Sequence, residues 1–424
     1  MPTVELQEWG DTFLPNVVLS SGDRRLAQTL QGVEIREMRD GLYIKASSRI
    51  GVVRFEAFVL RIRPKLTNID VMRMLLVAGG LNRLKRYRAT RDYELRDTNM
   101  SLFDLVALLL ADTCTVIARD GLLRGYVVEE YDLPVVRGRL RFTDQIRRRY
   151  GQVNRLECRF DDHHANVVEN RILHTALALC RRYVQHPHVR NRIQRLLDTF
   201  AAVSQPLDQN WRTVQADMAY NRLNSRYKEA HTLAWIIMAG LNIEDLLAAG
   251  CSRGFAFLLD MNPLFEKFME ILIRHILRND SIAVQAQLTA TGHIWDAERN
   301  QTYKRLRPDL LLTNLDCLSL AIDAKYKRYD AKKLHESDIY QTFLYTYAFR
   351  SADVDMLPSA LIVYPSDMPS TGMTRLHIRD SRGTVQARLH AFGVDIPSML
   401  DELFDDTVQK STSVLREAIR YLLT

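Results

Sequence analysis

The sequence predicts a multidomain α+β protein with a β-rich N-terminal domain, a mainly helical middle domain and a C-terminal α/β domain. Its 424 residues are enough for two or three domains, at roughly 100–200 residues per domain. Apolar and polar residues alternate in the first part of the chain, follow a helical spacing in the second, and form helix and strand patterns in turn in the third. We therefore divide the chain into residues 1–98, 99–250 and 251–424.

The N-terminal domain is expected to be β-rich because short alternating runs occupy Gly41–Ile50 and Val52–Pro64. Three cations, Arg61, Arg63 and Lys65, surround the end of the second run. Arginine forks and lysine ammonium groups bind phosphate and carboxylate groups. These three residues are therefore candidates for contact with a partner protein or nucleic acid.

The middle domain is expected to contain several helices, because apolar residues recur there at helical spacing. The segments are Leu102–Arg119, Asn166–Gln185, His188–Val203, Met218–Tyr227 and Glu229–Ala239. Between the first two lies a charged segment, Gly121–Phe160, which is expected to be irregular. In it, Arg137 and Arg139 are candidates for contact with a partner or a nucleotide edge. Alternatively, the triplet Arg137-Gly138-Arg139 is a turn in which Gly138 supplies a positive φ.

The C-terminal domain shows helix, strands, helix and strand in that order, which is typical of an α/β domain. The predicted elements are the helix Pro263–Arg278, the strands Ile282–Leu288, Tyr303–Thr313 and Cys317–Tyr329, the helix Leu334–Arg350, the strand Ala360–Tyr364 and a last helix near Ser398–Tyr421.

Two of these strands carry acidic residues near their ends. Asp323 and Lys325 are two residues apart on one strand, so both side chains point to the same face. An antiparallel neighbour can bring Asp309 alongside them. Two carboxylates with one lysine form a hard oxygen site for Mg²⁺ beside a cation that can stabilise a developing phosphate charge. The alternative is a set of surface charges on an edge hairpin, which is less attractive because charges inside a buried strand are costly without a partner.

The two helices that flank these strands carry further polar residues that could belong to the same site. Glu266 stands at the N-terminal end of the first helix as a possible third carboxylate, although an acidic residue in a first turn also simply favours the helix dipole. Gln341 and Tyr345 are four residues apart and share one helix face. They could hold a metal ligand or contact DNA, or belong to an ordinary aromatic stripe.

Several classes of protein are excluded by what the sequence lacks. No stretch approaches the roughly 18 apolar residues of a membrane span, and the N-terminus does not have the pattern of a secretory signal. Five cysteines without a CxxC pair favour a reducing cytoplasm. There is no Gly-Lys dipeptide and hence no P-loop, so we expect this chain alone to bind no nucleotide and another polypeptide to supply any nucleotide hydrolysis.

The net charge of +7 is unevenly distributed. Residues 1–98 have an excess of five basic side chains and residues 99–250 an excess of three, whereas residues 251–424 have one more acidic than basic side chain. We therefore expect the first two-thirds of the chain to meet an acidic partner surface or a path of DNA.

One ordered set of motifs resembles the α-β-β-β-α-β core of PD-(D/E)XK nucleases, including the Gln-xxx-Tyr variant of RecB-like members. In chain order, the set consists of helix-borne Glu266, Pro-Asp309, Asp323-x-Lys325 and the helix pair Gln341 and Tyr345. Further segments resemble the McrC family, the nuclease subunit of McrBC-type modification-dependent restriction systems, from about residue 40 to 365. These segments are Leu60–Leu66, Gly121–Arg139, Phe160–Ile172 and Met261–Phe268.

The resemblance implies a restriction-endonuclease-like C-terminal domain and two partners: a hexameric McrB-like AAA+ GTPase, which the chain stimulates, and double-stranded DNA with modified cytosine. It implies one or two Mg²⁺ ions on Asp309, Asp323 and Glu266, with Lys325 positioning water or stabilising charge. Gln341 and Tyr345 would support the site. Two other functions stay open: an inactive adaptor that bridges the GTPase to DNA, and a standalone repair-type nuclease.

Overall fold

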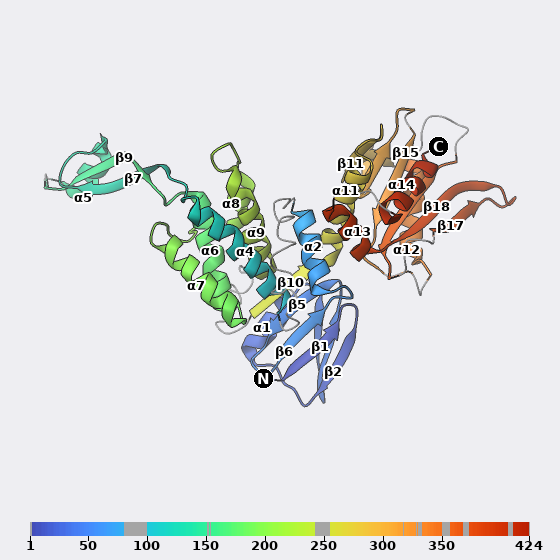
Figure 1. The fold of residues 1–424 in the computed structure, drawn as a ribbon, viewed down its shortest axis with the longest axis horizontal. Coiled ribbons are helices and arrows are strands. Elements are labelled where there is room, and N and C mark those ends of the chain that lie inside the picture. The colour runs from blue at the N-terminus through green and yellow to red at the C-terminus, as the bar shows by residue number, and fades with distance from the viewer. Residues whose placement is uncertain are drawn as a thin grey trace.

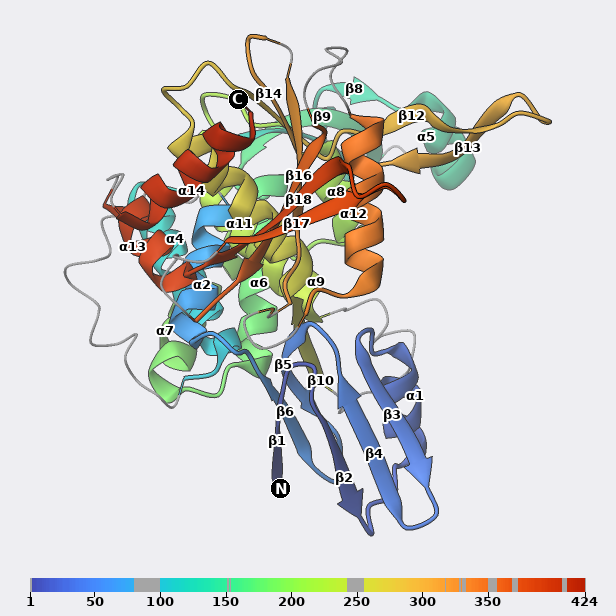
Figure 2. The same cartoon turned by 90° about the vertical axis from the view of Figure 1, so that its right-hand side faces the viewer.

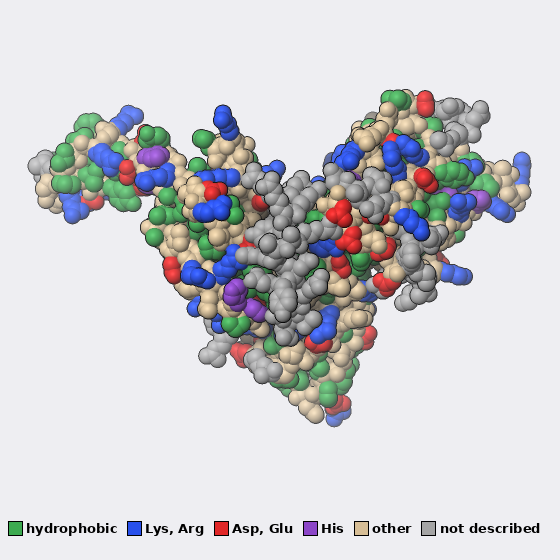
Figure 3. Space-filling model, viewed as in Figure 1, with side chains coloured by type: hydrophobic (Ala, Val, Ile, Leu, Met, Phe, Trp, Pro, Cys, Tyr) green, Lys and Arg blue, Asp and Glu red, His purple; other side chains and the backbone are tan. Residues whose placement is uncertain are grey.

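The computed structural model describes residues 2–79, 100–150, 152, 154–241, 255–316, 318–327, 329, 333–349, 357–367, 373–405 and 410–423. Figure 1 shows the N-terminal strands at the point of a V, the helices of the middle region on one limb and the C-terminal sheet on the other. The space-filling view in Figure 3 has the same V-shaped outline. Within the described ranges, no helix combines the length and the apolar character that a membrane crossing needs.

Two sheets form the N-terminal region, with strand orders β1-β6-β5-β10 and β2-β4-β3. Their strands are β1 (Thr3–Gln7), β2 (Asp11–Pro15), β3 (Val33–Met38), β4 (Gly41–Ala46), β5 (Arg49–Arg54), β6 (Val59–Arg63) and β10 (Phe255–Asp260). The alternation seen in the sequence is present in β6, where Leu60 and Ile62 are buried and Arg63 is exposed. Among the described residues, the helices α1 (Ser21–Thr29) and α2 (Asn68–Ala78) also belong to the region.

β10 lies far along the chain from the sheet that it completes. It pairs antiparallel with β5 along its whole length, so residues that the sequence division assigns to the C-terminal domain lie in the N-terminal sheet. The next helix, α11 (Met261–Ile276), begins at the residue after β10. Ser48 holds this junction, because its hydroxyl donates to Asp260 Oδ1 at 3.0 Å and its carbonyl accepts from the Met261 N–H at 3.1 Å.

The helices of the middle region pack into one hydrophobic core, which also includes α2 and α11. They are α4 (Leu102–Arg119), α6 (Val168–Tyr183), α7 (Pro187–Ala201), α8 (Trp211–Asp217) and α9 (Lys228–Leu241). The prediction of a helix at Met218–Tyr227 is wrong, since only Ser225–Tyr227 form a single 3₁₀ turn. The Asn224 side chain accepts from the Asn221 N–H at 2.7 Å, and such local bonds compete with helix formation.

A projecting arm interrupts the helices between α4 and α6 (Figure 1). It consists of β7 (Gly125–Leu133), β8 (Arg139–Leu140), α5 (Phe142–Arg149) and β9 (Leu156–His164). The prediction of an irregular segment is wrong, because ion pairs such as Arg149 with Asp132 at 2.7 Å support these strands where an apolar pattern is lacking. Gly138 has a φ of +68°, and a Cβ there would lie 2.5 Å from the Arg159 carbonyl oxygen, so the turn requires glycine.

The C-terminal region is built on a six-stranded sheet with the order β11-β14-β15-β16-β18-β17. Its strands are β11 (Ala283–Ala286), β14 (Leu310–Thr313), β15 (Ser319–Ala324), β16 (Ser359–Pro365), β17 (Met373–Arg379) and β18 (Val385–Val394). One face packs on α11, where Ile322 lies, and the other on α12 (Glu336–Ala348), where Ala321 lies (Figure 2). The chain order α11, β11, β14, β15, α12 and β16 agrees with the predicted alternation of helices and strands.

One run predicted as a single strand, Tyr303–Thr313, is two strands. β13 (Gln301–Leu306) pairs with β12 (Ala290–Asp296) in a hairpin outside the main sheet, and β14 begins at Leu310. Pro308 stands at the break because it has no N–H to donate to a ladder. The break leaves Asp309 directly before β14.

The end of the chain forms two helices, α13 (Ile396–Phe404) and α14 (Lys410–Leu422), in place of the single helix predicted near Ser398–Tyr421. Asp280, which follows α11, holds α14: it accepts two hydrogen bonds of 2.8 Å from Arg416 and also pairs with Arg420. The hydrogen bonds from Arg416 lower the pKa of Asp280.

We expect Asp280→Asn to lower the free energy of unfolding by about 1.5–3 kcal/mol at neutral pH, the usual range for hydrogen bonds to charged groups. Because folding lowers the pKa of this carboxyl, its contribution is present above the unfolded pKa and is lost as pH falls through the folded pKa. Chemical denaturation of parent and variant at neutral and acid pH measures this contribution. A difference that stays the same at acid pH would contradict the charged pairing.

Candidate active site

Two carboxylates of the main sheet meet where β14 begins and β15 ends. β14 runs antiparallel to β15 with Leu310 opposite Ile322, which brings Asp309 beside the end of β15. Asp309 Oδ2 accepts a hydrogen bond of 2.7 Å from the Ala324 N–H. Asp323 is only 1% exposed. The structure therefore brings together the two aspartates that the sequence singles out, in a largely buried position.

Lys325 and α12 complete one side of this cluster. Lys325 Nζ lies 3.0 Å from Asp323 Oδ2 and donates to Gln341 Oε1 at 3.2 Å. Gln341 Nε2 in turn donates to Tyr345 Oη at 2.8 Å, and the Tyr345 hydroxyl donates to the Arg307 carbonyl at 3.0 Å. This chain of hydrogen bonds joins the lysine, the helix and the segment that leads into Asp309.

Glu266 approaches from α11. Its side chain is half-buried, and burial raises the pKa of Glu266. The Asp323 carboxylate adds to this rise, whereas the Lys325 ammonium opposes it. All six residues proposed from the sequence for the site thus lie within electrostatic or hydrogen-bonding reach of at least one other member.

Several carboxylates lie close together in this cluster, and their pKa values are shifted by burial and by one another. Burial raises the pKa of Asp309, and the Asp323 and Glu266 carboxylates raise it further. Burial also raises the pKa of Asp323, although Lys325 opposes the rise. For Lys325, burial alone would lower the pKa, but the carboxylates of Asp323 and Asp309 outweigh it and the pKa is raised. Three carboxylates therefore share one ammonium group, which favours the binding of a further cation.

Sequence reasoning missed a second polar cluster next to the first. Asp338, which is buried on α12, forms an ion pair of 2.8 Å with Lys327 and accepts from the Tyr329 hydroxyl. After burial and Lys325, the Asp338 carboxylate is the next influence on the pKa of Asp323, and it raises that pKa. The signal that could have revealed Lys327 is its position two residues after Lys325.

A second missed contact joins the site to the N-terminal region. The Tyr326 hydroxyl donates to Glu8 Oε1 at 3.0 Å. The Tyr326 ring also lies 5.8 Å from the Phe265 ring, between centroids. Tyr326 follows Lys325 and Phe265 precedes Glu266 in the sequence, so this contact lies directly against the candidate site.

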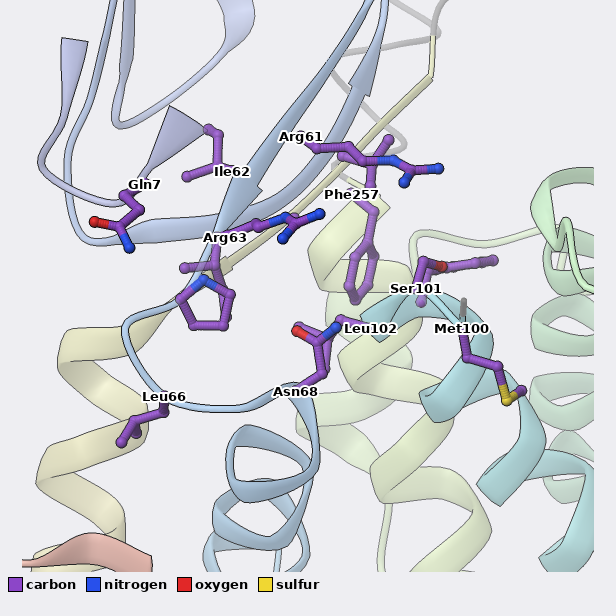
Figure 4. A pocket seen from close by; sticks show the side chains of 15 residues that line it. Gln7, Arg61, Ile62, Arg63, Leu66, Asn68, Met100, Ser101, Leu102 and Phe257 are labelled. Atoms are coloured by element: carbon purple, nitrogen blue, oxygen red, sulfur yellow. The ribbon is translucent and has the colours of Figure 1, made fainter. Parts of the chain in front are cut away.

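The three cations proposed at the end of β6 do not join this cluster. Arg61 and Arg63 line a cavity of about 640 Å³ between β6 and the N-terminal ends of α2 and α4 (Figure 4). Arg61 Nε is buried there without a hydrogen-bond partner among the described residues, whereas Arg63 pairs with Glu5 at 2.6 Å. Lys65 lies outside this cavity, and its backbone N–H donates to Glu8 at 2.7 Å.

The two arginines proposed around Gly138 lie on the arm. Arg137 pairs with Asp162 at 2.8 Å and lies over the Phe160 ring at 4.2 Å, so the arm itself holds this side chain. Arg139 borders a cleft of about 540 Å³ together with Arg159 and Phe160. Within the described part of the chain, Arg139 has no carboxylate partner.

Fold and site together define a multidomain α+β protein whose C-terminal sheet carries a buried cluster of carboxylates and one lysine. The chain belongs to the McrBC family: the family model described as McrBC 5-methylcytosine restriction system component matches residues 44–365. This match confirms the family resemblance seen in the sequence. Among curated proteins, none matches the chain.

A solved structure agrees with this assignment at the level of the fold. One similar chain comes from the refined half-complex of a tetradecameric assembly of Thermococcus gammatolerans McrB AAA+ hexamers with bound McrC. Its TM-score is 0.61 at 16% sequence identity, and the match covers 99% of this chain and 100% of that chain. A chain from the cryo-EM structure of the T. gammatolerans McrBC complex matches with a TM-score of 0.44 and 19% identity, over 65% of this chain and 88% of that chain.

Proposed function

We propose that this restriction-system component is a Mg²⁺-dependent DNA endonuclease with a PD-(D/E)XK core. The observation that carries the proposal is the meeting of buried Asp323 and half-buried Asp309 at the ends of adjacent strands, with the Lys325 ammonium 3.0 Å from Asp323. The alternative of a surface hairpin does not agree with an exposure of 1% for Asp323. The chain order of α11, the three strands, α12 and β16 also supports this type of core.

The residues present fit a magnesium ion. Half-buried Asp309 lies beside buried Asp323, and the Asp323 carboxylate raises the pKa of Asp309 beyond the effect of burial. No group of three His, Cys, Asp or Glu side chains with metal-ligand spacing occurs among the described residues. We therefore assign the ion to this pair, with Glu266 acting through water, because Mg²⁺ in proteins often keeps several waters and binds through one or two carboxylates. When bound, Mg²⁺ would polarise the phosphate and make a water molecule more acidic.

The remaining side chains have distinct roles in this proposal. Lys325 Nζ stabilises the negative charge that develops on the phosphate, since a fixed buried charge is more effective there than a solvated one. Gln341 holds the ammonium group by its 3.2 Å hydrogen bond. Tyr345 fixes Gln341 and the backbone before Asp309. Asp338 keeps Lys327 and Tyr329 in place behind the site.

We further propose that the chain works with an McrB-like AAA+ GTPase hexamer, as the T. gammatolerans tetradecameric assembly contains McrB AAA+ hexamers with bound McrC. We assign the arm to this partner because it projects from the helices and exposes large apolar side chains (Figure 3). The most exposed are Tyr126 at 79%, Val135 at 71% and Tyr150 at 88%. Exposed apolar surface of this kind marks interaction sites.

A cleavage assay tests the proposal. The purified chain is incubated with duplex DNA that contains or lacks 5-methylcytosine, with and without the GTPase, GTP and Mg²⁺. We expect cuts in both strands only when the GTPase, GTP, Mg²⁺ and methylated DNA are all present. A folded chain that binds the GTPase and DNA but never cuts would be an adaptor. Cleavage by the chain alone would indicate a standalone nuclease.

A further inference from the structure

We infer that the β12–β13 hairpin is a DNA-gripping element that binds the sugar-phosphate backbone of the duplex beside the candidate site. This inference rests on the proposed nuclease function and assigns a surface for its substrate. Figure 2 shows the hairpin projecting beyond α12, away from the main sheet.

One face of β13 carries a row of exposed side chains, and the strand leads directly into the site. Tyr303, Arg305 and Arg307 occupy alternate positions, so their side chains share one face of the extended chain. All three are exposed, and the same segment leads through Pro308 into Asp309. The six residues of β13 span about 20 Å, which exceeds the width of about 12 Å of a major groove in B-DNA. β13 is therefore long enough to follow a duplex across one groove, and its C-terminal end continues through Pro308 into Asp309.

The side chains of the hairpin suit a ligand that combines negative charge with aromatic rings, as nucleic acid does. Residues 290–307 contain four basic and two acidic residues, although the region 251–424 as a whole has one acidic residue in excess. Arg305, on the face of Tyr303, has no carboxylate partner in the described part of the chain. Tyr303 itself is 73% exposed. An unpaired cation beside an exposed aromatic ring is a usual composition of a nucleic-acid surface.

The base of the hairpin is anchored to the residues of the site. Ile294 and Leu306 pack with Tyr345 and Phe349 in one small cluster, and the Tyr345 hydroxyl bonds to the Arg307 carbonyl at 3.0 Å. The Arg307 charge also opposes the rise in the pKa of Glu266 that burial causes, although Lys325 opposes it more strongly. A phosphate held by the hairpin is thus placed relative to the carboxylates by packed side chains and hydrogen bonds.

The test uses the full chain in complex with its GTPase and compares the parent with the double variant Tyr303→Ala/Arg305→Glu. We expect cleavage of methylated duplex to fall at least tenfold, because the double variant loses one stacking contact and one phosphate contact and adds a charge that repels the backbone. The dependence of DNA affinity on salt should become shallower by about one phosphate contact. GTPase stimulation and melting temperature should stay unchanged. The single variant Arg305→Gln, which keeps the Tyr303 ring, should give a smaller loss of cleavage.

Arg382→Glu is the matched control, since Arg382 is an exposed arginine in the turn between β17 and β18 of the same region. We expect this variant to leave cleavage, DNA affinity and GTPase stimulation unchanged. Unchanged DNA affinity in the hairpin variants would overturn the inference, as would a fall in GTPase stimulation, which would assign the hairpin to the protein partner. DNA affinity is measured separately from cleavage. A parent chain that binds DNA through the hairpin but never cuts would refute the nuclease proposal alone.

Discussion

Replacing Asp309 by asparagine should reduce DNA cleavage by at least roughly 1000-fold, because a loss of about 4 kcal/mol in transition-state stabilisation has this effect. The substitution keeps the shape of the side chain, and its amide oxygen can still accept from the Ala324 N–H. It removes one of the two carboxylates assigned to Mg²⁺, so the metal should bind more weakly. Cleavage rates with the GTPase, GTP and methylated duplex measure the effect.

Two further measurements separate a loss of chemistry from a loss of fold. Asp309→Asn should melt no lower than the parent, because it removes repulsion from Asp323 and Glu266. Mg²⁺ should raise the melting temperature of the parent but not of the variant, since a ligand that binds only the folded state stabilises it. Asp316→Asn serves as the control: Asp316 is an exposed acid in the turn after β14. Full cleavage by Asp309→Asn would refute the assignment of the site.

The second large effect is expected on the arm. Arg139→Glu should weaken stimulation of the GTPase at least tenfold, which corresponds to about 1.4 kcal/mol in binding. Arg139 borders the arm cleft beside Arg159 and Phe160 without a carboxylate partner among the described residues. A reversed charge there should repel an acidic partner surface and leave an unpaired acid at the contact.

Titration of the GTPase with the parent and variant chains measures this effect as a change in half-saturating concentration. Arg147→Glu is the matched control, because Arg147 is an exposed arginine on α5 of the same arm and does not line the cleft. Equal losses in both variants would attribute the effect to the net charge of the arm and would contradict a specific contact at the cleft. Loss of stimulation should leave DNA binding by the β12–β13 hairpin intact.

The arrangement of the candidate site was predictable because its pattern is local. The alternation of a strand puts Asp323 and Lys325 on one face, and the spacing of a helix puts Gln341 and Tyr345 on one face. The preceding strand pattern is interrupted at Pro308, and the next residue is Asp309. These relations depend on residues close in sequence, and each is present in the structure.

The features that sequence reasoning missed depend on pairing between distant segments. Tyr326 meets Glu8 across the chain, and neither residue carries a local sign of that contact. Asp338 looks like a favourable first-turn acid until the fold brings Lys327 and Tyr329 to it. The arm was overlooked for another reason: many of its side chains are charged and joined in ion pairs, so the apolar period that reveals a strand is weak there.

The direct passage from β10 into α11 has a mechanical consequence. Because Asp260 ends the strand and Met261 begins the helix, with Ser48 bonded to both, no hinge residue separates them. A tilt of the N-terminal sheet would therefore have to be accompanied by a tilt of α11, the helix that carries Glu266. A force applied to the first sheet by another molecule would reach the candidate site as a rigid-body rotation, without any loop having to fold.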